Sequence, residues 1–253
     1  MSHPKIEVRN LTISFDGVSI LKNVSFSVES GKALVFIGPS GSGKTTLLKT
    51  ICGLSMPQAG DILVDNLNLY KCSSEVRAEK MQRIGMLFQK NALFDSFTCG
   101  ENIAFPLREV TSLSEIEIGE RVDYFLEAVG IPHAKLLYPD EISGGMQKRL
   151  GIARALALEP EIILYDDPTA GLDPITSKKI IQLILELKQK NNSTVLAVTN
   201  DMGRAYQLAD RIGMVVDHEF LMTGSPKETK QHADLRVQQF IKGETTGPLN
   251  VMG

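Results

Sequence analysis

One glycine-rich octapeptide constrains the fold of this chain more than any other segment. Residues 38–45 read Gly-Pro-Ser-Gly-Ser-Gly-Lys-Thr and match the pattern G-x-x-x-x-G-K-[ST] at every fixed position. An apolar run, Ala33 to Ile37, comes directly before the octapeptide, and a helix-like stretch, Thr45 to Gly53, follows it. Glycines allow a tight turn in which successive backbone N–H groups point at phosphate oxygens, and the helix start adds its positive dipole end. The segment therefore predicts a strand, a phosphate-binding loop and a helix.

Two side chains at the end of this loop have expected roles. Lys44 is expected to reach the β- and γ-phosphates of a nucleotide, and the Thr45 hydroxyl to bind Mg²⁺. Such a site also needs a carboxylate at the end of a neighbouring strand, and the apolar run from Ile162 ends in Asp166. Asp166 is expected to hold the Mg²⁺ shell, and Asp167 to face the water that attacks the γ-phosphate. The simpler alternative is that the two acids merely end a strand in solvent.

Continuous apolar runs indicate strands covered on both faces, as in a parallel sheet. They occur at Ala33–Ile37, Ile162–Tyr165, Thr194–Thr199 and Ile212–Val216. Between the second and third runs, Pro174 to Lys190 has apolar residues at helical spacing, with Asp173 as its N-cap. The segment Ile6 to Val28 alternates more and contains an Asp16-Gly17 turn signal, which predicts antiparallel strands.

The remaining segments complete an α/β prediction. Residues 91–155 have a helical texture, and within them Glu115 to Gly130 suits a helix whose apolar residues are Ile116, Val122, Phe125, Leu126 and Val129. A polar composition with Gly243, Gly247 and Pro248 predicts a loosely packed tail over 226–253. The pattern predicts an α/β core at 1–90 and 156–225, with an antiparallel β subdomain and a helical subdomain inserted at 91–155. With its octapeptide this core resembles that of the P-loop NTPases (RecA-like), which is the fold we expect.

Composition excludes several classes of protein. The 27 Lys and Arg residues against 30 Asp and Glu give a net charge of −3, whereas a general nucleic-acid binder shows a basic excess, so no nucleic acid is expected as a partner. The cysteines, Cys52, Cys72 and Cys99, form no C-x-x-C pair and are expected to be reduced and intracellular. No apolar run approaches ~18 residues, so the chain is expected neither to cross a membrane nor to be exported.

A second turn of the anion-binding type lies between the octapeptide and the acidic pair. Ser143-Gly144-Gly145 precedes a helix-like stretch, Leu150 to Leu158, and a Ser-Gly-Gly turn that opens a helix offers backbone N–H groups to an anion. We therefore expect the second phosphate-binding helix start of the chain to bind a different nucleotide from the first.

The order of these motifs resembles that of the nucleotide-binding subunits of ABC transporters, over roughly residues 6–225. The matching segments are a Walker A motif at 38–45, a Q-loop glutamine at Gln89, a signature at 142–146, a Walker B motif at 162–166 and a D-loop at 170–173. The resemblance implies one ATP-binding domain over 1–253 that hydrolyses ATP with Mg²⁺. It also implies a head-to-tail homodimer in which ATP lies between the Walker motifs of one copy and the signature of the other.

The resemblance also implies the residues of the site. Phe15 takes the position of an aromatic residue that stacks on adenine, although a core or turn phenylalanine is the alternative. The implied nucleotide contacts are Phe15, Gly38, Pro39, Ser40, Gly41, Ser42, Gly43, Lys44, Thr45, Thr46, Ser143, Gly144 and Gly145. The implied metal ligands are Thr45, Gln89 and Asp166, and the implied catalytic residues are Asp167, Gln89 and Asn200.

A narrower resemblance is to the Mla-type ATPases, which energise phospholipid transport with mammalian-cell-entry (MCE) proteins. It lies in Met146, in residues 91–94 and 101–108, in 171–177 and in the tail at 234–240 with Gly247-Pro248. It implies a transmembrane permease as partner, STAS-type and MCE-type accessory subunits, and a place on the inner face of the cytoplasmic membrane. In that subfamily the C-terminal extension helps hold the dimer.

Two positions depart from the family pattern. Asp167 stands where ABC ATPases usually have glutamate, and Asn200 where they usually have histidine. Asp167 is one methylene shorter, and Asn200 can donate a hydrogen bond but cannot become cationic. Because a 1 Å misplacement can cost ~10²-fold in rate, we expect slow ATP hydrolysis. The alternatives are an ATP-gated subunit with little or no hydrolysis, an importer subunit for another small-molecule cargo, and a soluble ABC ATPase of DNA repair or translation, which usually carries coiled-coil insertions that this chain lacks.

The apolar residues after Gln89 have two interpretations. Leu93, Phe94 and Phe97 either fill the core of the helical insert or belong to a groove that receives a coupling helix of the permease.

Overall fold

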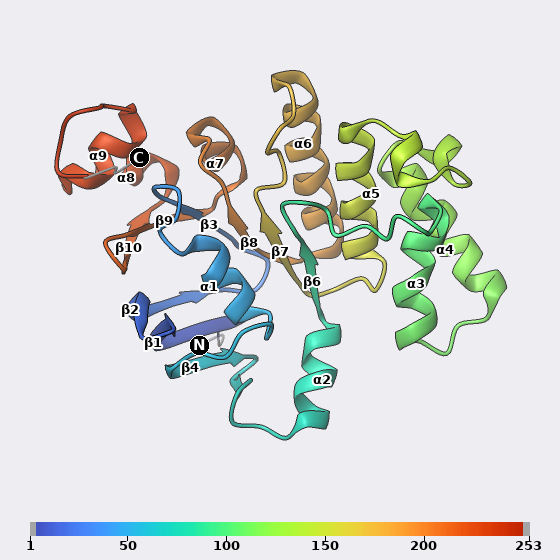
Figure 1. Ribbon diagram of the computed structural model, residues 1–253, viewed down its shortest axis with the longest axis horizontal. Helices are drawn as coiled ribbons and strands as arrows, with labels where there is room; N and C mark the ends of the chain where they lie inside the picture. The colour runs from blue at the N-terminus through green and yellow to red at the C-terminus, as the bar shows by residue number, and fades with distance from the viewer. Residues whose placement is uncertain (1–3, 250–253) are drawn as a thin grey trace. The chain divides into compact units, whose positions relative to one another are not determined.

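The computed structural model describes residues 4–249, which form two compact units. The first comprises residues 4–81 and 194–249, and the second residues 82–193. Figure 1 shows the elements of both units in chain order by colour.

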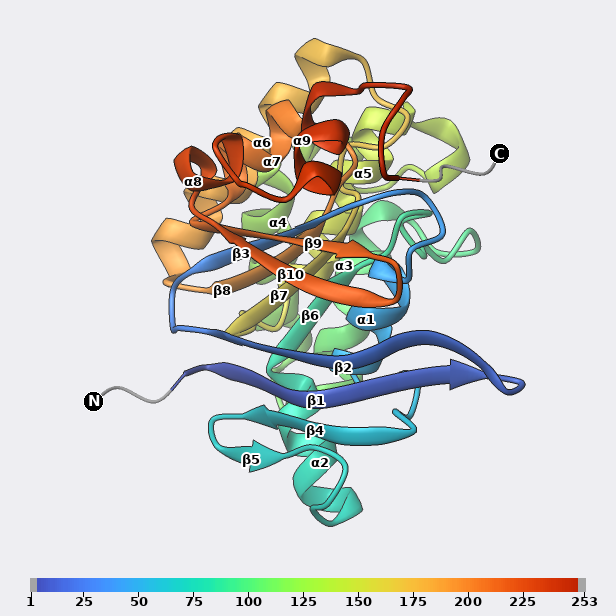
Figure 2. The same ribbon diagram turned by 90° about the vertical axis from the view of Figure 1, so that its left-hand side faces the viewer.

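The first unit contains an antiparallel sheet with the strand order β2-β1-β4-β5 (Figure 2). The strands are β1 (Ile6–Phe15), β2 (Val18–Val28), β4 (Ala59–Val64) and β5 (Leu67–Asn68). The alternation predicted for residues 6–28 is confirmed: Ile6, Val8 and Ile13 of β1 are buried. The β1–β2 turn is made by Asp16 at φ +48° and Gly17 at φ +79°, a left-handed pair typical of two-residue hairpin turns.

Three parallel strands and one antiparallel edge strand form the other layer of the first unit, in the order β10-β9-β3-β8. The central strand, β3 (Ala33–Ile37), pairs in parallel with β8 (Thr194–Val198) on one side and β9 (Arg211–Val216) on the other, and β10 (Glu219–Gly224) is antiparallel to β9. Every residue of β3 and β8 is buried, as the continuous apolar runs predict. The helices of this layer are α1 (Lys44–Ile51) and α7 (Met202–Leu208), and α2 (Ser74–Gln82) runs to the division between the units.

The two layers of the first unit meet through three phenylalanines. The rings of Phe26, Phe36 and Phe220 lie 4.9 to 5.8 Å apart between centroids, mostly in edge-on or tilted contact. A Cβ on Gly213 would lie 2.2 Å from the Phe220 ring, so glycine at this position lets the ring lie against β9. The aromatic cluster thereby fixes the sheet that carries the phosphate-binding loop.

The predicted loosely packed tail is wrong for residues 226–249, and residues 250–253 lie outside the described part. The segment forms α8 (Pro226–Lys230) and α9 (Leu235–Lys242), and Ser225 and Glu228 make a capping box at the start of α8. Thr229 and Val237 are fully buried, and the buried Gln239 side chain accepts from the N–H of Leu249 at 2.7 Å. Polar residues that suggested solvation serve here as helix caps and buried hydrogen-bond partners.

The second unit is built on two parallel strands and four α-helices (Figure 1). Its strands are β6 (Ile84–Leu87) and β7 (Ile162–Asp166), and its helices are α3 (Cys99–Val110), α4 (Glu115–Ala128), α5 (Gly144–Leu156) and α6 (Pro174–Asn191), with short 3₁₀ turns at Pro132–Ala134 and Pro139–Glu141. The predicted cap of α6 is confirmed, because Asp173 accepts from the N–H groups of Ile175 and Thr176.

One face of α4 differs from the prediction. Val122, Phe125 and Leu126 are buried as expected, but Ile116 is 76% exposed and Ile118 is buried in its place. The register of α4 places Ile118, four residues before Val122, on the buried stripe, whereas Ile116 falls on the opposite side in the first turn.

Candidate nucleotide-binding site

The phosphate-binding loop joins β3 to α1 in a conformation that requires glycine. Gly38 has φ +138°, and a Cβ there would lie 2.1 Å from the Val215 carbonyl oxygen of β9. Gly43, the N-cap of α1, has φ +99°, and its Cβ would lie 2.8 Å from the Ile20 side chain of β2. The loop is thus clamped between β9 and β2 with no room for side chains at its two ends.

Lys44 turns back over the loop that precedes it. Its Nζ donates to the carbonyl oxygens of Gly38 and Pro39, both at 2.7 Å, and to Ser42 Oγ at 3.4 Å, and the residue is only 6% exposed. Gly43 brings no side chain to the start of α1, and the first turn of that helix holds no acidic residue. A buried cation and the first N–H groups of a helix therefore share one small turn, which is the arrangement that an anion needs.

Asn200 and Phe15 lie in the same unit as this loop. Phe36 of β3 pairs in parallel with Val198 of β8, so Gly38 and Asn200 each follow the paired residues by two and leave the sheet at the same edge. Asn200 is exposed, directly before Asp201, the N-cap of α7. Phe15 ends β1 directly before the β1–β2 turn and is 49% exposed, so it is not a core residue; the turn alternative and the adenine contact both stay open.

The second unit holds Gln89 and the acidic pair. Leu87 of β6 pairs in parallel with Tyr165 of β7, so Gln89 and Asp167 each lie two residues beyond the same edge. Asp166 is buried, and Asp167 is partly exposed with φ +48°. The left-handed conformation favours aspartate over glutamate, because a short polar side chain compensates the backbone locally. This backbone was not predictable from the acidic pair alone.

The Ser-Gly-Gly turn starts α5 in the second unit. Ser143 is the N-cap, and its Oγ accepts from the N–H of Met146 at 3.3 Å, which leaves the hydroxyl hydrogen available to donate. Ser143 and Gly144 are exposed, and the first turn of α5 contains no acidic residue. A Cβ on Gly144 would meet no heavy atom within 4 Å. This helix start faces open space, as a cradle for an external anion would.

Lys148 is a residue of the site that sequence reasoning missed. It lies one turn into α5, is 4% exposed, and its Nζ donates to the backbone oxygen of Gln89. Burial lowers the pKa of Lys148, and the charges of Asp167 and Asp166 oppose that effect. The signal available in the sequence is a lysine four residues before Ile152, on the side of α5 that also carries Gly151; its partner 59 residues earlier is not visible there.

The segment after Gln89 packs around aromatic rings. Phe94, Phe97 and Phe105 form a half-buried cluster with centroids 4.9 to 5.7 Å apart, and Arg154 lies 4.4 Å above the Phe94 ring. The buried Asn102 side chain donates to the carbonyls of Phe94 and Phe97, both at 3.1 Å. These rings make a surface layer of the second unit, neither a sealed core nor a bare groove.

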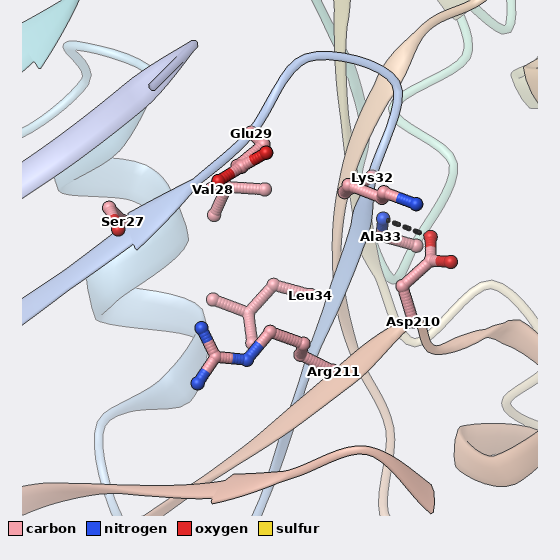
Figure 3. Close-up of a pocket in the computed structure, with 8 residues that line it drawn as sticks. All are labelled: Ser27, Val28, Glu29, Lys32, Ala33, Leu34, Asp210 and Arg211. Carbon is pink, nitrogen blue, oxygen red and sulfur yellow. Dashed lines mark hydrogen bonds between the residues drawn. The ribbon is translucent and has the colours of Figure 1, made fainter. Parts of the chain in front are cut away.

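One pocket of the first unit lies away from this loop. A pocket of about 280 Å³ opens at the opposite end of β3, where the N–H of Ala33 donates to Asp210 at 2.8 Å beside Lys32 and Arg211 (Figure 3). Among residues 4–249, no group of three or more His, Cys, Asp or Glu side chains is placed to hold a metal ion. Over the same range, the helices are too short or too polar for a membrane span.

The chain belongs to the ABC transporter family. A family profile described as "ABC transporter" matches residues 21–170, which include both helix starts and the acidic pair. The fold is the ABC cassette, with a P-loop core, an antiparallel β subdomain and a helical subdomain, as predicted. The protein is an ATP-binding, ATP-hydrolysing subunit of an ABC transporter.

Relatives with two different names are similar to nearly the whole chain. The chain is 42% identical over 249 residues to the Haemophilus influenzae "Intermembrane phospholipid transport system ATP-binding protein MlaF", covering 98% of this chain and 94% of that one. The Escherichia coli K12 protein of the same name is 38% identical, with 96% and 91% covered. A Mycobacterium tuberculosis "Probable ribonucleotide transport ATP-binding protein mkl" is 40% identical, with 97% and 68% covered.

Solved cassettes share the fold. A dimeric post-hydrolysis state of the ATP-binding cassette MJ0796 bound to ADP and Pi superposes with a TM-score of 0.78 at 34% identity, over 85% of this chain and 95% of that one. The structure of cbiO1 from Clostridium perfringens, part of the cbiONQ transporter complex, gives a TM-score of 0.82 at 28% identity over 96% of both chains.

Proposed function

We propose that this subunit energises phospholipid transport together with a transmembrane permease and an MCE-type system. The observation that carries the proposal is the end-to-end similarity to MlaF of Haemophilus influenzae, which covers 98% of this chain and 94% of the relative. The mycobacterial mkl relatives are as similar per residue but have about a third of their length outside the match. The tail found helical at 226–249 lies within the length shared with MlaF.

The site residues have the following roles in the proposal. The loop 38–45, with Thr46, binds the phosphates; Lys44 leaves its own carbonyl partners for the β- and γ-phosphates, and Phe15 stacks on adenine. Two copies associate head to tail, so that the turn of Ser143, Gly144 and Gly145 completes the site of the other copy, and the dimeric structures of MJ0796 support the association of two copies. Each copy forms one domain, with residues 91–155 as its helical subdomain.

Mg²⁺ fits the oxygen donors present in this chain. The Thr45 hydroxyl, the Asp166 carboxylate and the Gln89 amide oxygen are hard ligands of the kind that Mg²⁺ prefers, and no thiolate or imidazole competes among these three. Bound there, the ion would neutralise phosphate charge. Asp167 orients the attacking water, and Gln89 and Asn200 hold polar hydrogens toward the γ-phosphate.

Hydrolysis is slow in this proposal. The side chain of Asp167 is shorter than glutamate and reaches less far toward the attacking water. The amide of Asn200 cannot carry the positive charge that a histidine could. The left-handed backbone at position 167 supports the presence of aspartate there, since φ +48° suits aspartate better than glutamate. The accessory partners in the proposal are STAS-type and MCE-type subunits, and the complex lies on the inner face of the cytoplasmic membrane.

Reconstitution with a transmembrane permease tests the proposal. The complex in liposomes is expected to turn over ATP above a Lys44→Ala blank and to move fluorescent phospholipid in an ATP-dependent way. ATP-dependent uptake of radiolabelled ribonucleotides, with no movement of lipid, would favour the second candidate function, which the mkl relatives support. ATP binding without turnover would favour the ATP-gated subunit.

A further inference from the structure

The loop that carries Gln89 is strained and externally held. Asn91 and Ala92 both have positive φ, +61° and +51°, a conformation that costs a non-glycine residue free energy and persists only where its surroundings enforce it. Two backbone hydrogen bonds close the segment on itself, from the N–H of Asn91 to Phe88 O at 2.9 Å and from the N–H of Ala92 to Lys90 O at 2.7 Å. The segment Phe-Gln-Lys-Asn-Ala contains neither glycine nor proline, and further contacts come from elsewhere in the second unit.

Helix α5 supplies these contacts. Lys148 donates to the Gln89 oxygen, and Arg154 donates to the Ala92 oxygen while its guanidinium lies over Phe94. Each of the two residues is three positions from Gly151, so residues 148, 151 and 154 form one i, i+3 row along the helix. Between them, a Cβ on Gly151 would come within 2.7 Å of Leu87 and 3.4 Å of Asn91, so a glycine lets this side of α5 approach the loop. Two cations and one close approach thus hold both ends of residues 89–92.

Lys148 differs from Arg154 because it also lies in the field of the acidic pair. Its burial, at 4% exposure, is costly for an ammonium unless charge and hydrogen bonds compensate. The compensation comes from the Gln89 carbonyl and from the carboxylates of Asp167 and Asp166, which act on it electrostatically. One side chain therefore faces both the loop of the glutamine and the end of β7.

We propose that Lys148 is a positioning residue for ATP hydrolysis, which fixes the Gln89 loop against the acidic end of β7. The inference rests on the proposed roles of Gln89, Asp166 and Asp167. Because Lys148 is one turn from Ser143 on the same rigid helix, a shift of the α5 start reaches the Gln89 loop directly. The cradle that binds the other copy's nucleotide and the glutamine of the copy's own site then move as one body.

Three variants of the full chain test the proposal. Lys148→Met removes the charge and the hydrogen bond at similar length, Lys148→Arg keeps both, and Lys179→Met is the matched control at an exposed position of α6. Two quantities are measured: kcat and KM for ATP, and hydrogen exchange of the amides of residues 88–92 with those of α4 as internal reference. We expect Lys148→Met to lower kcat at least ~10-fold with KM within about twofold. Exchange at 88–92 should rise about tenfold or more, and α4 should be unchanged.

The outcomes distinguish a failure of the positioning role of Lys148 from a failure of the proposed ATPase roles. Lys148→Arg should retain most of the wild-type kcat and protection, and Lys179→Met all of it. A Lys148→Met chain with wild-type kcat and unchanged exchange overturns the proposal. The proposal is also overturned by a Lys148→Met chain with lower kcat, higher KM and lower stability, if Lys148→Arg does not restore them. Should the wild type show no turnover above Lys44→Ala, the proposed ATPase roles fail; exchange at 88–92 still decides whether Lys148 holds the loop. If Lys148→Met does not fold, Lys148→Gln replaces it in both measurements.

Discussion

Helices α1 and α5 both start at a turn that can bind an anion, but the two starts are built differently. The α1 start has a left-handed glycine cap wedged against neighbouring strands and a buried lysine that curls back over the turn. The α5 start has a serine cap, an exposed Gly144 with space around it, a partly exposed Gly145, and no cation of its own. The first cation of α5, Lys148, donates away from the turn to the Gln89 oxygen.

The difference indicates a division of labour. Hydrogen bonds from a charged donor are roughly twice as strong as neutral ones, so the α1 start can hold a polyphosphate alone. The α5 start offers only neutral donors and binds weakly until another surface delivers the phosphate. A chain with one strong and one weak cradle is suited to a dimer in which each nucleotide contacts one of each kind.

The glycines of the two starts should respond very differently to an added methyl group. Gly38→Ala places a Cβ 2.1 Å from the Val215 oxygen at φ +138°, and we expect it to destabilise the fold by about 4 kcal/mol, measured by urea unfolding. Gly144→Ala meets nothing within 4 Å and should change the free energy of unfolding by less than ~1 kcal/mol. Equal effects at the two positions would contradict the description of one clamped and one open turn.

Removal of the α1 cation should abolish tight nucleotide binding. Lys44→Ala deletes the one buried ammonium of the turn, and we expect ATP affinity to fall at least ~100-fold in a fluorescent-nucleotide titration. Lys49→Ala, at an exposed position in the last turn of the same helix, is the control and should bind as the wild type does. Unchanged affinity in Lys44→Ala would show that the strong cradle does not depend on its cation.

Restoration of the usual catalytic pair should accelerate turnover without strengthening binding. We expect Asp167→Glu with Asn200→His to raise kcat by about tenfold, because carboxylate reach and a cationic donor return. The same Asp167→Glu change should cost roughly 0.5–1 kcal/mol of stability, since glutamate fits φ +48° less well. An unaltered kcat in the double variant would mean that these positions do not limit the rate.

The tail offers the smallest effect, and it depends on pH. Arg236 lies beside Asp234 and lowers the pKa of this carboxyl from its ordinary 3.8 to about 2. The ionised form is therefore stabilised in the folded chain, and this contribution is present above pH 4 and lost as the pH falls through 2. Thermal unfolding should show Asp234→Asn less stable than the wild type at pH 5, with most of the difference gone by pH 2 and the rest lost below it. A stability difference that grows toward low pH would contradict this assignment.

Much of the fold could be predicted from the sequence because its central strands are unambiguous. β3, β7, β8 and β9 are continuously apolar, and each was expected within one or two residues of where it lies. The tail could not be predicted, because Gln239 looks like a solvated residue until the N–H of Leu249 is found to donate to it. A side-chain hydrogen bond to a backbone group ten residues away leaves no periodic signal in the sequence.

The site was predictable as far as its motifs are local. The turns at 38–45 and 143–145 each open a helix, and local spacing is enough to find them. The backbone of Asp167 and the bond from Lys148 to Gln89 depend on packing between segments far apart in the chain. The residues that tune the chemistry were therefore less visible than those that bind the phosphate.

Complementation between two inactive variants tests the division of labour most directly. Lys44→Ala damages only the strong cradle and Ser143→Arg only the weak one, so each homodimer should be inactive. In a mixed head-to-tail dimer one site carries both defects and the other neither, and random mixing should restore about a quarter of the wild-type ATP turnover. The double variant mixed with itself is the blank. Absence of restoration, with mixed dimers shown to form by affinity tags, would contradict the claim that the two helix starts serve one nucleotide from different copies.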